Sequence, residues 1–130
     1  MGGIKMCNRL HEDFKKIKSE GFGYKIFGAK NTPCFSISPY SVNKGCIKWE
    51  WGGINDGFCF FTSKKEALRL LKKLKGIRSS FDEGYINHYI CKIEYSGGMG
   101  KHEEDNIVND GSIYITAICK EFKILEQVTK

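Results

Sequence analysis

The spacing of hydrophobic residues predicts one helix clearly in the middle of the chain. Between Ser63 and Gly76, apolar residues recur every three or four positions, which is the spacing of one helical face: Ala67, Leu68, Leu71 and Leu74. Ser63 with Glu66 three residues later is typical of a capping box, and Gly76 is typical of a helix end. The segment is therefore expected to be an amphipathic helix.

A second helix is predicted near the start of the chain, from about Asn8 to Glu20. Asn8 is a suitable N-terminal cap, and the four- and three-residue spacing of Leu10, Phe14 and Ile17 indicates an inward face. The sequence SEGFG would end this helix.

The remaining apolar runs are short and rich in β-branched and aromatic residues, and Gly, Asn, Pro and Asp separate them. Six strands are expected, in the runs YKIF, CFSIS, CIKWEW, GFCFF, HYICKIEY and SIYITAICKEFKIL. GFCFF is apolar throughout, which indicates a central strand. We expect a single α+β domain over residues 1–130, with about residues 1–7 outside the ordered part. Its antiparallel or mixed sheet of about six strands would carry two packed helices.

Composition fits such a domain, since 41% of the residues are hydrophobic and 13% are aromatic. No run approaches the length of a membrane span, and the first residues reach charge before any signal-peptide core. We therefore expect a cytoplasmic protein without a membrane partner. Its six cysteines would then be thiols, and those in apolar strand-like runs (Cys59, Cys91 and Cys119) are expected to be buried.

The net charge of +6 is concentrated in one segment. Residues 64–78 hold seven basic residues and one acidic residue, and the charges of the rest of the chain cancel. In the predicted helix, four basic residues fall on the side opposite the apolar stripe: Lys65, Arg69, Lys72 and Lys73. Such a face is a common footprint for phosphate backbones or acidic surfaces.

Trp49 and Trp51 extend this hypothesis, because alternate residues of a strand share one face and exposed rings can stack on bases. The alternative is that both tryptophans belong to the core. We therefore expect a small basic binding module that docks on nucleic acid or on an acidic surface of a host complex. The Lys-, Ile- and Asn-rich composition associates it with accessory or inhibitor proteins of phages and mobile elements.

The stretch SGGMGKH (96–102) raises the question of a phosphate-binding loop. A P-loop needs an early Gly and a hydroxyl after the Lys, whereas Tyr95 and His102 occupy those positions. We interpret the stretch as a hairpin-like connection. The residues at its end (His102, Glu103, Glu104 and Asp105) are interpreted as solvated charge, so no metal site is expected.

The order of GFCFFTSKKEAL, a helix, YICKIEYSGG and IYITAICKEFKIL resembles the centre of ADP-ribosyltransferase-like folds, over roughly residues 21–125. The resemblance implies NAD as a cofactor, in an active transferase or in an inactive relative. By position, Lys25 would orient NAD, Thr62 would lie near the nicotinamide, and Glu121 would activate the ribose. A third hypothesis, a small-ligand binding protein with an aromatic pocket in the sheet, stays open. Under the other two hypotheses, the binding module and the small-ligand binding protein, no cofactor is expected.

Overall fold

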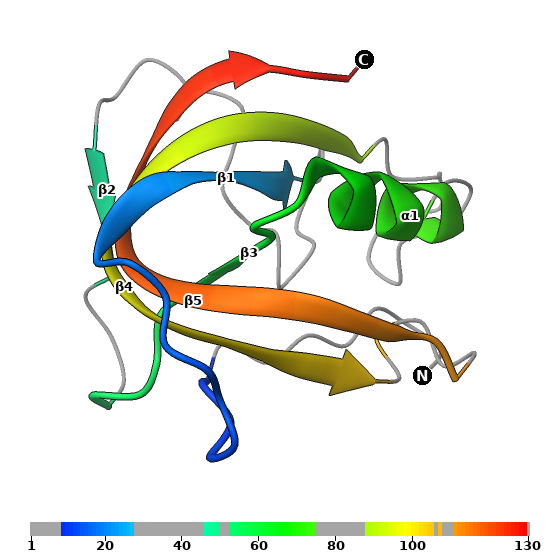
Figure 1. Ribbon diagram of the computed structural model, residues 1–130. Coiled ribbons are helices and arrows are strands. Elements are labelled where there is room, and N and C mark those ends of the chain that lie inside the picture. The colour runs from blue at the N-terminus through cyan, green and yellow to red at the C-terminus, as the bar shows by residue number, and fades with distance from the viewer. Residues whose placement is uncertain are drawn as a thin grey trace.

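The structure is a computed structural model that describes residues 9–27, 46–49, 53–74, 88–105, 107 and 111–129. Within these ranges the chain forms five strands and one helix (Figure 1). In chain order they are β1 (Glu20–Phe27), β2 (Cys46–Lys48), β3 (Phe58–Phe60), α1 (Lys64–Leu74), β4 (Tyr89–Asp105) and β5 (Ile113–Gln127).

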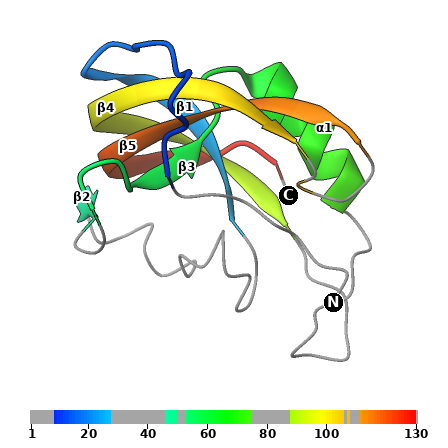
Figure 2. The same ribbon diagram turned by 90° about the horizontal axis from the view of Figure 1, so that it is seen from below.

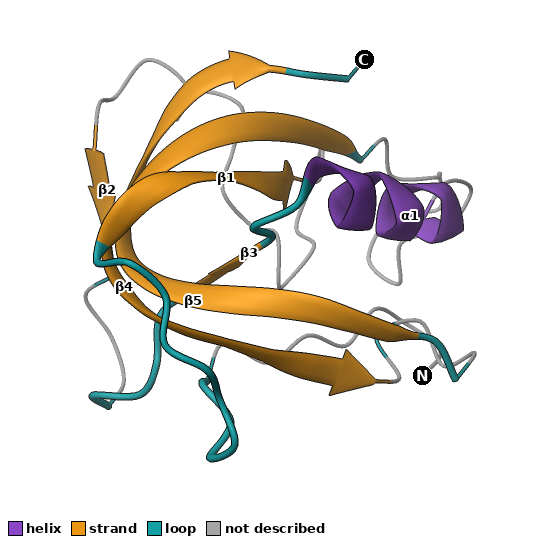
Figure 3. Cartoon of the chain, viewed as in Figure 1, coloured by secondary structure: helices purple, strands orange, loops and turns teal. Residues whose placement is uncertain are grey.

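All five strands belong to one antiparallel sheet, with the order β1-β4-β5-β2 and with β3 also paired to β5. The long strands β4 and β5 bend together, so that the sheet is strongly curved (Figures 1 and 2). The curve brings β1 close to the residue after β3, where Tyr24 and Phe61 exchange two backbone hydrogen bonds of 2.8 and 2.7 Å. α1 lies at the open side of the curve (Figure 3).

The predicted fold class is wrong, because the described residues hold one helix rather than two, on a sheet of five strands. The predicted helix at 8–20 is an irregular segment over residues 9–19 that leads into β1. Its amide groups bond to distant parts of the chain: Leu10 N–H donates to Asn55 at 2.9 Å, and Lys15 exchanges two 2.8 Å bonds with Lys101. These long-range bonds replace the local ladder that a helix would need.

Five of the six predicted strand runs contain a strand, and the sixth, CFSIS, lies outside the described residues. All three residues of β3 are buried, but β3 is not the predicted central strand, because among the described strands its only ladder is with β5 and it lies off the main strand order. The SGGMGKH stretch is wrongly predicted as a connection, because it lies within β4 and pairs with β5.

The glycines of that stretch allow another part of the chain to pass close to β4. A β-carbon on Gly98 would lie 2.3 Å from the carbonyl oxygen of Lys18, and one on Gly100 would lie 2.4 Å from the Phe14 ring. The Gly98 N–H donates to Ser19 at 3.0 Å, and the β4–β5 register shifts between Gly98 and Gly100. Gly is therefore required here for close packing rather than for phosphate binding.

The amphipathic helix is confirmed as α1. The Ser63 hydroxyl accepts the Glu66 N–H at 3.3 Å, which is the expected cap. Four residues form its buried side, with Leu68 partly buried beside them: Ala67, Leu70, Leu71 and Leu74. The predicted end at Gly76 lies outside the described residues. No helix in the described parts of the chain has the length and apolar character that a membrane span requires.

Buried side chains form two clusters. The first joins α1 to Ile26, Phe61, Ile90 and Tyr114. Half of the buried residues in the second cluster are aromatic, and within it the Phe58 and Phe122 rings meet edge to face at 4.8 Å.

The strand cysteines Cys59, Cys91 and Cys119 are buried thiols, as predicted, whereas Cys46 is an exposed thiol. Cys7 and Cys34 lie outside the described residues. Burial raises the pKa of Cys91 to about 11. It raises the pKa of Cys119 to about 12, although the positive charge of Lys25 acts in the opposite direction.

We expect an alkylating reagent at neutral pH to modify Cys46 in the native protein and to leave these three buried thiols intact until denaturant is added. A hydrogen bond with Glu121 raises the pKa of Cys46. Glu121→Gln should therefore increase the rate of Cys46 alkylation roughly twofold or more, because the thiolate fraction rises. Peptide mass spectrometry over a time course measures both effects, and rapid modification of Cys119 in the native protein would contradict the first.

Candidate functional site

The predicted basic face is present on α1. Lys64, Lys65 and Lys72 are exposed, and the charge of Lys65 also acts on the neighbouring Glu66 carboxylate. They border a groove of about 850 Å³, whose further lining includes Leu68, Leu71, Arg69 and Thr129. The groove therefore combines an apolar floor with a cationic rim.

A second hollow of about 350 Å³ lies at the N-terminal end of α1. Lys65 borders both hollows, and Lys101 of β4 lines the second one together with Thr62 and Ser63. The cationic surface thus continues from α1 onto β4.

Arg69 has a different role from the lysines, because its guanidinium is engaged by the protein itself. It donates to Glu66 at 3.0 Å and to the carbonyl of Ile113, and it stacks on the Tyr114 ring at 4.1 Å from the ring centre. Glu66 also accepts the Ile115 N–H at 2.9 Å, so Glu66 and Arg69 together fasten α1 to the edge of β5. Arg69 is thus held in place by a carboxylate of its own helix.

The electrostatics of Glu66 reflect this arrangement. Partial burial acts to raise its pKa, but the Arg69 guanidinium and the Ile115 N–H outweigh burial and hold the pKa below the usual value. The carboxyl is therefore ionised at neutral pH, and the negative charge of Glu66 offsets the positive charge of Arg69. Lys73 is also exposed, and it too has an interaction partner.

Trp49 does not share a site with the basic face. It follows β2, which lies at the opposite end of the sheet from α1 in both views (Figures 1 and 2). Its indole is partly buried and packs edge to face on Phe58 at 5.0 Å. Trp49 is therefore part of the second cluster, and Trp51 lies outside the described residues.

The three residues assigned by the transferase resemblance lie in different environments. Lys25 is only 2% exposed and donates to the carbonyl of Cys59 at 2.7 Å, inside the aromatic cluster. Thr62 is exposed in the turn before α1, and Glu121 of β5 contacts the thiol of Cys46. A role for these residues with NAD stays a prediction.

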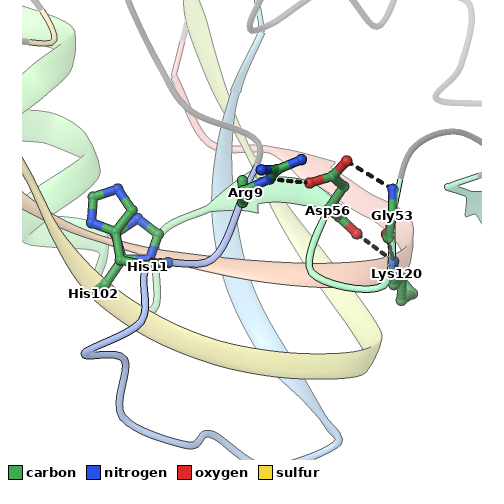
Figure 4. A network of polar contacts seen from close by, with 6 residues as sticks. All are labelled: Arg9, His11, Gly53, Asp56, His102 and Lys120. Atoms are coloured by element: carbon green, nitrogen blue, oxygen red, sulfur yellow. Dashed lines mark hydrogen bonds and ion pairs between the residues drawn. The ribbon is translucent and has the colours of Figure 1, made fainter.

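A cluster of two histidines and a carboxylate lies where β4 meets the N-terminal segment. The Nε2 atom of His102 is 3.1 Å from Glu104 Oε1, and the Nε2 atom of His11 is 3.4 Å from the same oxygen. The two imidazole rings stack at 3.8 Å with an angle of 12° (Figure 4). Thr116, opposite His102 on β5, places its hydroxyl 3.4 Å from His102 Nε2.

The interpretation of residues 102–105 as solvated charge is wrong for two of them. The His102 side chain is fully buried and that of Glu104 is 12% exposed, whereas Glu103 and Asp105 are exposed. The difference follows from strand alternation, since His102 and Glu104 share the inner face. Because this stretch was predicted as a loop, strand alternation was not applied to it, and the burial of His102 and Glu104 was missed.

A polar network next to this cluster holds the N-terminal segment and the turn at 53–57 (Figure 4). Asp56 accepts the Arg9 guanidinium and the Gly53 N–H, each at 2.9 Å. Lys120 donates to the carbonyls of Gly53 and Asp56. The Gly53 N–H and the Arg9 guanidinium hold the pKa of Asp56 below its usual value.

Comparison of the chain with models of protein families, with curated proteins and with solved structures finds no match.

Proposed function

We propose that the protein is a small binding module that docks the groove of α1 on an acidic protein surface, such as a component of a host complex. The observation that carries the proposal is the cationic rim of this groove, where Lys64, Lys65 and Lys72 are exposed. The lysines would pair with carboxylates of the partner, and electrostatic attraction would orient its approach.

The floor of the groove favours a protein partner over nucleic acid. Leu68 and Leu71 lie between the lysines, so an acidic segment with apolar side chains would find both kinds of contact. Base stacking would need an exposed ring at the groove, and no described residue that lines it is aromatic: Trp49 lies at the far end of the sheet and Tyr114 is buried under Arg69. Contacts to a phosphate backbone alone remain the competing possibility.

The proposal predicts that Lys65→Glu combined with Lys72→Glu weakens binding to a fluorescent peptide of Glu and Leu residues by at least about tenfold, because two attractions become repulsions. Fluorescence anisotropy at two salt concentrations measures the affinity, which should fall as salt increases. A labelled DNA duplex and a labelled RNA strand serve as competing probes.

The matched control combines Lys16→Glu with Lys123→Glu. Both lysines are exposed, both lie outside α1, and the change in net charge is the same. Equal loss of binding in the two variants would show a non-specific charge effect and would overturn the proposal. If the protein binds the DNA or RNA probe more tightly than the peptide, and only the α1 variant loses this binding, then the partner is nucleic acid and not an acidic protein surface.

A further inference from the structure

We propose that His11, His102 and Glu104 form a binding site for a divalent transition metal ion, with Zn²⁺ as the best fit. Each residue offers one ligand atom, and the three atoms all lie within 4.8 Å of one another. This site is separate from the α1 groove and does not depend on the partner of that groove.

The distances suit the size of the ion. A tetrahedral Zn²⁺ with ligands about 2.0–2.2 Å away has ligand atoms roughly 3.3–3.6 Å apart. The separations between Glu104 Oε1 and the two imidazole nitrogens, 3.1 and 3.4 Å, are close to this range. Imidazole with one carboxylate is a common zinc donor set, whereas Ca²⁺ and Mg²⁺ prefer oxygen ligands alone.

The surroundings fix two of the ligands before any ion binds. His102 and Glu104 are held on adjacent inward positions of β4, paired with Thr116 and Tyr114 of β5. His11 comes from a segment that backbone bonds already hold to the turn at 53–57 through Leu10 and to β4 through Lys15. The stacked imidazoles now both direct an Nε2 atom at the same carboxylate oxygen, so the rings must rotate for an ion to reach all three ligand atoms.

Metal binding also requires a change of tautomer at His102. Its Nδ1 atom now accepts the His11 N–H at 3.3 Å, so in the neutral ring the proton is on Nε2, next to Glu104. An Nε2–metal bond moves this proton to Nδ1, which then faces another donor. The His11 N–H contact must therefore be lost, and the backbone around His11 must shift when the ion binds.

Three protein ligands leave a coordination position for water or for a further group. The His102 side chain is fully buried and that of Glu104 is 12% exposed, so a group in this position would be largely shielded from solvent. In this arrangement the metal joins the N-terminal segment to β4.

Isothermal titration of the full chain with ZnCl₂ tests the site, in a Cys46→Ser background that removes the one exposed thiol among the described cysteines as a competing ligand. We expect one bound ion that raises the melting temperature, because the ligand set exists only in the folded state. His11→Gln should weaken Zn²⁺ binding by at least about tenfold and abolish the rise in melting temperature. His11 is partly exposed, with 36% of its side chain accessible, so this variant should fold.

Glu103→Gln is the matched control, since Glu103 neighbours both β4 ligands in sequence but is exposed on the other face. It should bind Zn²⁺ as the parent does. Two-dimensional NMR should show the His11 amide shift on saturation. Absence of binding, or binding that His11→Gln leaves unchanged, would overturn the metal site.

Discussion

Replacing Gly98 by alanine is expected to destabilise the protein by about 1–3 kcal/mol, the usual cost of forcing extra volume into a packed site. The new β-carbon would lie 2.3 Å from the backbone oxygen of Lys18 and 2.6 Å from the Tyr95 ring. A carbonyl oxygen cannot rotate away as a flexible side chain can, so the segment at 14–19 must move off β4. Urea denaturation followed by circular dichroism measures the free energy of unfolding.

Gly53→Ala is the matched control for this substitution. A β-carbon on Gly53 meets no atom within 4 Å, and its N–H remains available to Asp56. We expect a change of less than about 0.5 kcal/mol, as for most surface substitutions. If Gly98→Ala unfolds at the same urea concentration as Gly53→Ala, the N-terminal segment does not pack on β4 as described.

The sequence predicted α1 well because its signals are local. The Ser63 cap, the Glu66 position and the apolar stripe all act within a few residues of one another, so a pattern along the chain contains them. The same helical periodicity also predicted that the basic residues lie on the side of α1 opposite the apolar stripe. The role of Arg69 did not, since its partners Ile113 and Tyr114 are distant in sequence.

The segment at 9–19 was assigned wrongly because its structure depends on contacts with distant parts of the chain. The spacing of Leu10, Phe14 and Ile17 matches a helix, but Leu10 is buried while Phe14 is 38% exposed. Its backbone partners, Asn55 and Lys101, lie far along the chain. Helix propensity is a weak prior when tertiary hydrogen bonds compete for the same amides.

The histidine cluster was missed because two misassigned segments form it. His11 belongs to the segment that was predicted as a helix, and His102 to the stretch that was predicted as a loop. Only their contact across 91 residues, where the His11 N–H meets His102 Nδ1, gives them a joint role. Residue types alone therefore could not identify this candidate site.

The second large effect is expected at Lys25, where Lys25→Glu should destabilise the protein by about 3–5 kcal/mol, the cost of an uncompensated buried charge. The ammonium is 2% exposed and lies 5.8 Å from the ring centres of Phe27, Phe58 and Phe122. Ring faces attract a cation and repel an anion, and the nearby Cys59 carbonyl accepts a hydrogen bond that a carboxylate cannot donate. The repulsion by the ring faces and the loss of the hydrogen bond to Cys59 both destabilise the folded state.

Lys25→Met separates the charge of this side chain from its volume. Methionine fills a similar space and avoids burying an ion, so we expect a loss of less than about 2 kcal/mol, mainly from the bond to Cys59. Thermal and urea unfolding of both variants give the comparison. A Lys25→Glu variant as stable as the wild type would show that the side chain can leave the aromatic cluster. Only then would Lys25 be available to orient NAD, because a lysine held within the core cannot contact a cofactor in solution.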